Sequence, residues 1–142
     1  ARILRLRGHP GVAQAGHDGR LRVVHADIGR TGDYGMPLDE TTQVRWPDYY
    51  QAVWADPATT AADLVLVDGR FRVACALEAL ARCQPHTVLL FHDFWNRTPY
   101  HPVLAFTDWL GSCDSLALLR RKASIDATHF EAVRHAHRLN PQ

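Results

Sequence analysis

The clearest indication of the fold class is the segment Asp63-Leu64-Val65-Leu66-Val67-Asp68-Gly69-Arg70. Its apolar centre is continuous rather than alternating, which is typical of a strand covered on both faces in a parallel sheet. The glycine ends this strand, and residues 70–83 then carry apolar side chains at helical spacing. A second apolar strand over residues 87–91 ends in His92 and Asp93. A strand, a helix and a strand in this order predict a parallel α/β sheet.

The flanking sequence extends this alternation of strands and helices in both directions. Upstream, residues 21–26 are predicted to form a strand that ends at Asp27. Downstream, the pattern predicts a helix over about 100–110, a strand over 115–120 and an amphipathic helix over 127–139. We therefore expect one α/β domain over residues 1–142, with a mostly parallel sheet flanked by helices.

The remaining segments are predicted to be short helices and loops. Residues 1–8 have the pattern of a helix end, and residues 11–19 that of a linker with or without a short helix. The polar stretch 28–43 is predicted to be a mobile loop over the strand edge, because its G-x-x-G-x-x-G spacing differs from the dinucleotide-binding G-x-G-x-x-G. Trp46 and Tyr49 are expected to pack this loop down, the alternative being that they stack on a planar ligand.

Composition excludes several classes of partner. Sixteen Lys and Arg against 15 Asp and Glu give a formal net charge of +1, which predicts binding neither to nucleic acid nor to an anionic membrane. The sequence has no run of 18 apolar residues, so no membrane span is expected. The three cysteines lack C-x-x-C spacing, which predicts reduced thiols and a cytoplasmic protein.

Three of the predicted strands end in an acidic residue, at Asp27, Asp68 and Asp93. In a parallel α/β sheet, ligands bind outside the carboxyl ends of the strands, so these side chains form the candidate site. Asp68 and Asp93 together are predicted to bind a divalent cation such as Mg²⁺, which prefers carboxylate oxygens. The alternative for each acidic residue is a structural role as the N-cap of the next helix.

Histidines and arginines near the same edge are further candidates. His92 and His101 can serve as a general base or a metal ligand, with a packed or solvent-facing position as the alternative for each. One of Arg70 and Arg72 is expected to pair with a carboxylate of the site. The sequence has no G-x-S-x-G elbow, phosphate-binding loop or activated cysteine motif, which argues against serine or cysteine hydrolase chemistry.

These segments resemble a known family. The runs DLVLVDGRFRVACAL over residues 63–77, VLLFHDF over 88–94 and HADIGRTGDYG over 25–35 are similar to S-adenosylmethionine-dependent methyltransferases of the Rossmann-like class. The resemblance covers about residues 20–110. It implies S-adenosylmethionine as the cofactor and a small-molecule substrate. In this reading Asp27 lies near the adenine, and Asp68 lies beside the methionine end and the substrate.

The resemblance also implies the chemistry of the site. In metal-dependent members, which include the catechol O-methyltransferases, carboxylates that match Asp68 and Asp93 hold a divalent cation. That cation positions and acidifies a substrate hydroxyl. Asp68 and His92 are then the expected catalytic residues, Asp27 and Asp68 bind the cofactor, and Asp68 and Asp93 bind the metal.

Compared with this family, the fold is expected to be incomplete. The family's first strand with its glycine-rich loop, and the acidic residue of its second strand, have no match, and residues 1–8 look like the tail of its second helix. Loss of the central strand predicts an unpaired sheet edge and an uncovered apolar face. A homodimer across that edge is therefore expected.

Three functions follow as hypotheses. The first is methyl transfer to a hydroxyl of a small molecule or glycan, with or without a divalent cation. The second is a non-catalytic, degenerate Rossmann-like module that self-associates. The third is a metal-dependent sugar-nucleotide or phosphoester enzyme that uses the same paired carboxylates.

Overall fold

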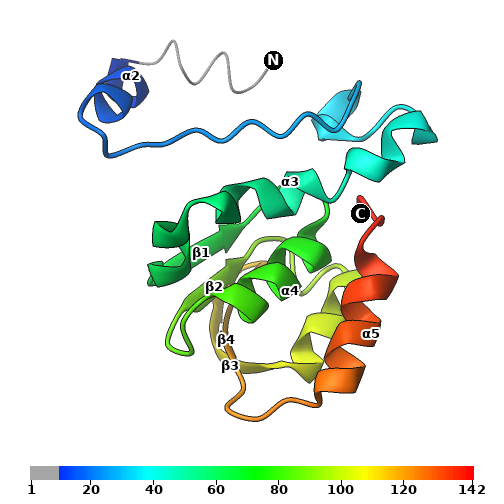
Figure 1. The fold of residues 1–142 in the computed structure, drawn as a ribbon. Helices are drawn as coiled ribbons and strands as arrows, with labels where there is room; N and C mark the ends of the chain where they lie inside the picture. The colour runs from blue at the N-terminus through cyan, green and yellow to red at the C-terminus, as the bar shows by residue number, and fades with distance from the viewer. Residues whose placement is uncertain (1–9) are drawn as a thin grey trace.

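A four-stranded sheet in the order β1-β2-β4-β3 forms the centre of the molecule (Figure 1). The structure, a computed structural model, describes residues 10–142. The fold is α/β, with helices flanking the sheet. Strands β1 (Leu64–Val67) and β2 (Val88–Phe91) run parallel, with Leu64 beside Val88. The other two strand pairs are antiparallel, so the prediction of a mostly parallel sheet is wrong.

The antiparallel half of the sheet is a hairpin of β3 (Thr107–Cys113) and β4 (Leu116–Arg121). Only Asp114 and Ser115 separate these strands, and a connection this short requires an antiparallel return. The strand predicted over 115–120 is confirmed as β4. The helix predicted over 100–110 is wrong, because the 3₁₀ helix η5 (Thr98–Ala105) gives way to β3. Pro102 inside η5 lacks a backbone donor and limits the length of this helix.

Helix α4 (Arg72–Arg82) connects the two parallel strands and lies in the core. Its Leu77 and Leu80 are buried in the same cluster as Leu89 of β2. Burial of each such side chain contributes about 1.5–3 kcal/mol. Helix α5 (Ala127–His137) adds the buried Phe130 to this cluster, so the amphipathic helix predicted near the end of the chain is confirmed.

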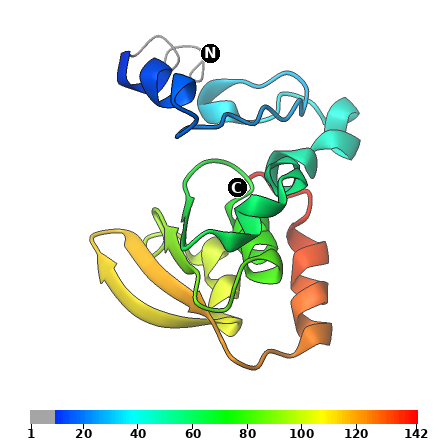
Figure 2. The same ribbon diagram turned by 60° about the vertical axis from the view of Figure 1, so that its left-hand side comes forward.

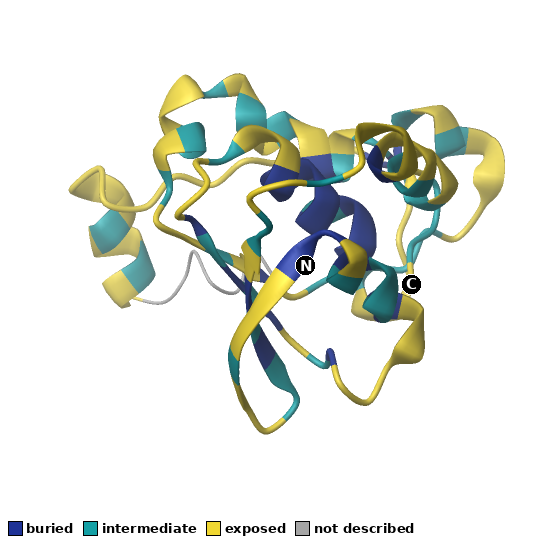
Figure 3. Ribbon diagram, turned by 90° about the horizontal axis from the view of Figure 1, so that it is seen from below, coloured by how far each residue is buried: buried dark blue, intermediate teal, exposed yellow. Residues whose placement is uncertain are grey.

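The two faces of the sheet differ in how deeply their side chains are buried. Val67 and Leu89 are buried in the core, whereas Leu64 and Leu66 are 56% and 61% exposed. Side chains alternate between the faces of a strand, so one face of β1 is open. The prediction that this strand is covered on both faces is therefore wrong. Within residues 10–142, β1 pairs with β2 alone, so the unpaired edge implied by the resemblance is present. Figure 3 shows the buried residues gathered along α4 and the adjoining strands.

The segment before the sheet begins with helix α2 (Pro10–His17), which has no buried residue. In Figures 1 and 2, α2 and the extended chain after it lie apart from the sheet. The strand predicted over 21–26 is wrong, because these residues are extended but lack a sheet partner in the described structure. A strand is stable only where a neighbour takes up its backbone hydrogen bonds. The helix end predicted at 1–8 lies outside the described residues.

The polar stretch 28–43 carries the 3₁₀ helix η1 (Asp33–Gly35) and most of η2 (Glu40–Arg45). After it, the short helices α3 (Asp48–Gln51), η3 (Ala52–Ala55) and η4 (Pro57–Ala61) lead to β1.

Aromatic packing holds this region against the start of α4. The rings of Trp46 and Tyr49 lie 5.8 and 5.3 Å from the ring of Phe71, between centroids. The expected packing of these two aromatic residues is therefore confirmed. Ile28 and Tyr50 are buried in the same cluster. The cluster fixes the chain from Ile28 to Tyr50 beside the residues that follow β1.

Candidate functional site

Three predicted site residues meet where the parallel strands end. Val67 of β1 lies in register with Phe91 of β2, so the residues after them are neighbours. The Nδ1 atom of His92 lies 3.6 Å from Oδ1 of Asp68 and 3.3 Å from Oδ1 of Asp93. The structure therefore brings Asp68, His92 and Asp93 into one cluster.

Arg72, in the first turn of α4, binds both carboxylates of this cluster. Its side chain is 6% exposed, with Nη1 3.2 Å from Oδ2 of Asp93 and Nη2 3.3 Å from Oδ1 of Asp68. It also donates hydrogen bonds to the carbonyl oxygens of Gly69, at 3.0 Å, and His92, at 2.7 Å. The prediction that one of the two nearby arginines pairs with a site carboxylate is confirmed for Arg72.

The surrounding charges keep Asp93 ionised. Burial by itself raises the pKa of this carboxyl, but the hydrogen bond from Arg72 and the charges of His92, Arg72 and Arg97 outweigh burial and hold the pKa below its ordinary value.

Asp93 has a φ of +57°, a left-handed conformation that Asp adopts more readily than most residues. Phe71, at the N-terminus of α4, also has a left-handed φ, of +53°. Full burial of its ring offsets that strain, which costs roughly 1–2 kcal/mol.

The two carboxylates predicted to bind a metal ion are both paired with Arg72. The Arg72 guanidinium lies within hydrogen-bond or ion-pair distance of both Asp68 and Asp93, and a cation between these carboxylates would be repelled by it. Across the described part of the chain, no group of three or more His, Cys, Asp and Glu side chains is placed to hold a metal ion. The Mg²⁺ site at Asp68 and Asp93 stays a prediction without support here.

Asp27 lies outside the cluster. Its carboxylate accepts a hydrogen bond of 3.0 Å from the backbone N–H of Gly29 and pairs with Arg45. The hydrogen bond from Gly29 and the charge of Arg45 lower the pKa of Asp27. Within residues 10–142, the hydrogen bonds and ion pairs of Asp27 do not involve Asp68, His92 or Asp93.

His101 occupies a packed position. Its Nε2 lies 3.1 Å from the carbonyl oxygen of Phe94, and its ring lies 5.1 Å from the Phe94 ring, between centroids. Of the two alternatives for this residue, the structure favours the structural one.

A cavity of about 340 Å³ runs along the edge of β1 and reaches Asp68, Gly69 and Arg70. Tyr49 and Trp54 form part of its wall. The contribution of Trp54 was not foreseen, because it depends on η3 folding back over β1. Cys75 also lines the cavity. Burial raises the pKa of its thiol to about 12, so at neutral pH it is not a thiolate nucleophile.

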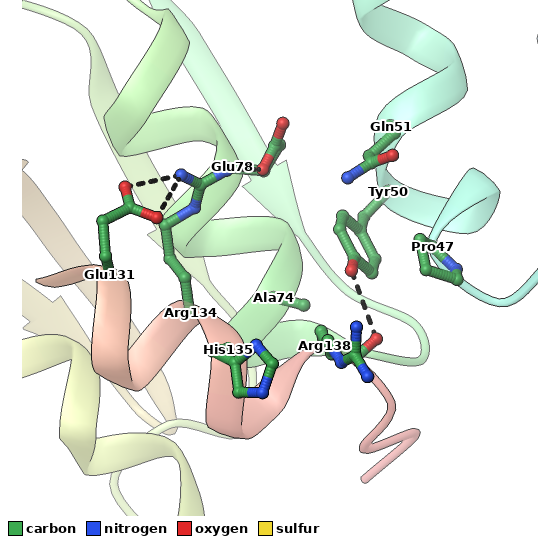
Figure 4. Close-up of a pocket in the computed structure, with 9 residues that line it drawn as sticks. All are labelled: Pro47, Tyr50, Gln51, Ala74, Glu78, Glu131, Arg134, His135 and Arg138. Carbon is green, nitrogen blue, oxygen red and sulfur yellow. Dashed lines mark hydrogen bonds and ion pairs between the residues drawn. The ribbon is translucent and has the colours of Figure 1, made fainter. Parts of the chain in front are cut away.

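A second cavity, of about 360 Å³, lies between α3, α4 and α5 (Figure 4). None of the predicted site residues lines it. Its Glu78 is 2% exposed and accepts hydrogen bonds from Arg82, at 2.6 Å, and Arg134, at 2.7 Å. Arg134 also binds Glu131, as the dashed lines in Figure 4 mark. Since the charges of Glu78, Glu131, Arg82 and Arg134 neutralise one another, this network connects α4 with α5 and is not free to bind a ligand.

The fold of this chain is similar to that of a methyltransferase-like protein of known structure. A crystal structure at 1.80 Å of a methyltransferase-like protein from Silicibacter pomeroyi DSS-3 matches the chain with a TM-score of 0.75 and 29% sequence identity. The match covers 92% of this chain and 71% of that chain. No protein-family model matches the sequence, and the curated proteins contain no match either. Within residues 10–142, no helix combines the length and the apolar character needed to cross a membrane.

Proposed function

We propose that this chain belongs to an S-adenosylmethionine-dependent methyltransferase that acts on a hydroxyl group of a small molecule or glycan. The observation that carries the proposal is the cluster of Asp68, His92 and Asp93 at the strand ends of a methyltransferase-like fold. Ligands of α/β sheets bind at this edge. The proposal includes no metal ion, because Arg72 already supplies the positive charge between the carboxylates.

His92 is the proposed general base. Carboxylates near Nδ1 favour the tautomer with the proton on that atom, which leaves Nε2 as a proton acceptor. The side chain is 47% exposed, so a substrate hydroxyl can reach it. By accepting the hydroxyl proton, His92 makes the oxygen a better nucleophile, an effect worth about 10²–10⁴-fold in rate. Asp93 and Asp68 stabilise the imidazolium that results.

The acidic residues offer groups that suit the cofactor. S-adenosylmethionine, when bound, supplies a methyl group on a positively charged sulfur. The side chains of Asp68 and Asp27 are 50% and 67% exposed, so each keeps oxygen lone pairs that can accept hydrogen bonds from amino groups. We assign Asp68 to the methionine end, beside His92, and Asp27 to the adenine end.

Thermal unfolding with S-adenosylhomocysteine tests the proposal. A ligand that binds only the native state raises the melting temperature, and at a hundredfold excess over Kd it stabilises by about 2.7 kcal/mol. Asp68→Asn should reduce the shift, whereas Asp108→Asn, at an exposed position on β3, should leave it unchanged. His92→Gln should keep the shift and lower methyl transfer about 100-fold. The absence of a shift for the unmodified protein, with and without Mg²⁺, would contradict the proposal.

A second candidate function is that of a self-associating module without turnover. The open edge of β1 and the exposed side chains of Leu64 and Leu66 favour it. A strand edge with unpaired backbone groups is a template for pairing with another chain. This candidate predicts a homodimer and no response to the cofactor product.

A further inference from the structure

Arg70 and Arg72 are close in sequence but differ in their partners. Arg72 is bound by two carboxylates and two carbonyl oxygens. The Nε atom of Arg70 is buried and has no hydrogen-bond partner in the described structure, where its side chain also forms no ion pair. A buried polar group of a cation without a partner is costly. The Nε–H group of Arg70 is therefore a buried donor that still needs an acceptor.

The cavity beside Arg70 suits one kind of ligand. Its walls include the apolar side chains of Val53, Trp54 and Leu66, and among its lining residues Asp68 and Arg70 carry the charges. A volume of about 340 Å³ lies at the lower end of the range for small-molecule sites. Apolar walls with a cation at one end fit a ring-containing molecule that bears an anionic group.

The backbone of Arg70 is held in place while its side chain is free to bind. Its N–H donates to the hydroxyl of Tyr49 at 3.1 Å, and its carbonyl accepts from Sγ of Cys75 at 3.5 Å. These bonds do not involve the guanidinium, so a substitution of the side chain leaves them intact. The fixed backbone reduces the entropy lost when a ligand binds, because only the side chain has to be ordered.

We infer that Arg70 binds the carboxylate or phosphate of an anionic ligand held in the cavity along β1. The guanidinium fork matches both oxyanions in a bidentate geometry. Asp68, at the same end of the cavity, repels the anion and accepts a hydrogen bond from a hydroxyl instead. If the ligand is the methyl acceptor, which rests on the proposed function, Asp68 directs this hydroxyl toward the adjacent His92.

Isothermal titration with benzoate, phenyl phosphate and benzyl alcohol tests the inference. We expect at least one of the two anions to bind the unmodified protein, and benzyl alcohol to bind at least tenfold more weakly. Arg70→Gln should weaken binding of that anion about tenfold, and Arg70→Lys should weaken it less, because the charge remains. Arg120→Gln, at an exposed position on β4 outside the cavity, should have no effect. Tighter binding of phenyl phosphate assigns a phosphate, and tighter binding of benzoate a carboxylate.

Two results would overturn the inference: equal binding of benzyl alcohol and the anions, or anion binding that is unchanged in Arg70→Gln. Circular dichroism establishes that Arg70→Gln is folded, and Arg70→Lys replaces it if it is not. The titration needs no cofactor, so it is independent of the proposed function. Anion binding without a response to S-adenosylhomocysteine contradicts only the methyltransferase proposal, and the reverse result contradicts only the role of Arg70.

Discussion

At the scale of single residues, Arg72 holds the candidate site together. Its 6% exposed side chain links the ends of both parallel strands through Asp68 and Asp93. The guanidinium also lies 5.5 Å from the centroid of the buried Tyr100 ring, which adds a cation–π contact. The orientation of the acidic cluster therefore depends on one buried cation.

Replacement of this cation should destabilise the protein. We expect Arg72→Met to lower the free energy of unfolding by about 3 kcal/mol, because partly buried carboxylates and carbonyl oxygens lose their partner. Arg97→Met is the matched control. Arg97 lies 3.6 Å from Asp93 with a 46% exposed side chain, so its loss should cost about 1 kcal/mol or less. Urea unfolding measures both, and equal losses would contradict this role of Arg72.

The stability that Asp93 contributes should depend on acid pH. Its folded-state pKa lies below the ordinary value of 3.8, so its contribution is complete above that value and is lost as the pH falls through the folded pKa. Asp93→Asn tolerates the left-handed backbone and removes the charge. We expect the difference in unfolding free energy between the two proteins to persist from neutral pH to about pH 4 and to shrink below it. A difference that shrinks between pH 7 and pH 5 would argue against this assignment.

At the scale of elements, the hairpin between β3 and β4 decides the direction of half the sheet. Its turn begins at Asp114, which has a φ of +50°. A two-residue turn with a positive φ at its first position prefers Gly there. The backbone at Asp114 is therefore strained, and this conformation allows a turn of two residues to close the hairpin.

Relief of this strain should stabilise the protein. We expect Asp114→Gly to raise the free energy of unfolding by about 0.5 kcal/mol and Asp114→Val to lower it by about 1–2 kcal/mol. Asp114→Asn should change it little, because Asn tolerates the same conformation. The urea midpoint at a constant slope measures these differences. Equal stabilities of the glycine and valine variants would refute the strain.

At the scale of the whole molecule, the sheet has one well-covered face and one that is open at β1. The covered face packs on α4 and α5 around Leu77, Phe91 and Phe130. On the open side, Leu64 and Leu66 are more than half exposed, at the edge strand. Exposed apolar side chains beside unpaired backbone groups favour association with another chain.

The oligomeric state tests this open face. If two copies pair through β1, light scattering should give the mass of a dimer, and Leu66→Glu should shift the protein to a monomer. Leu110→Glu places the same charge on β3, at the opposite edge of the sheet, where Leu110 is 43% exposed, and should leave the dimer intact. A monomeric unmodified protein at high concentration would exclude self-association as the function.

Much of the site was predictable from sequence because it follows β1 and β2 directly. A run of apolar residues, a glycine and a helical spacing specify the β1–α4–β2 unit locally, and adjacent parallel strands must bring Asp68 and Asp93 to the same edge. His92 reaches the same edge because it directly precedes Asp93 in the sequence. The choice of Arg72 over Arg70 as their partner could not be predicted, since it depends on how α4 begins after the left-handed Phe71.

Three features follow from the order of the amino acids, because each depends on neighbours along the chain: the α/β class, the parallel strand pair and the acidic cluster. Four other features required the folded structure: the antiparallel direction of β4, the exposure of Leu66, the lack of a sheet partner for residues 21–26 within residues 10–142, and the pairing of Asp27 with Arg45. Each of these depends on which distant segments pack together. Strand pairing and burial are interactions between residues far apart in sequence, and a local pattern does not specify the partner.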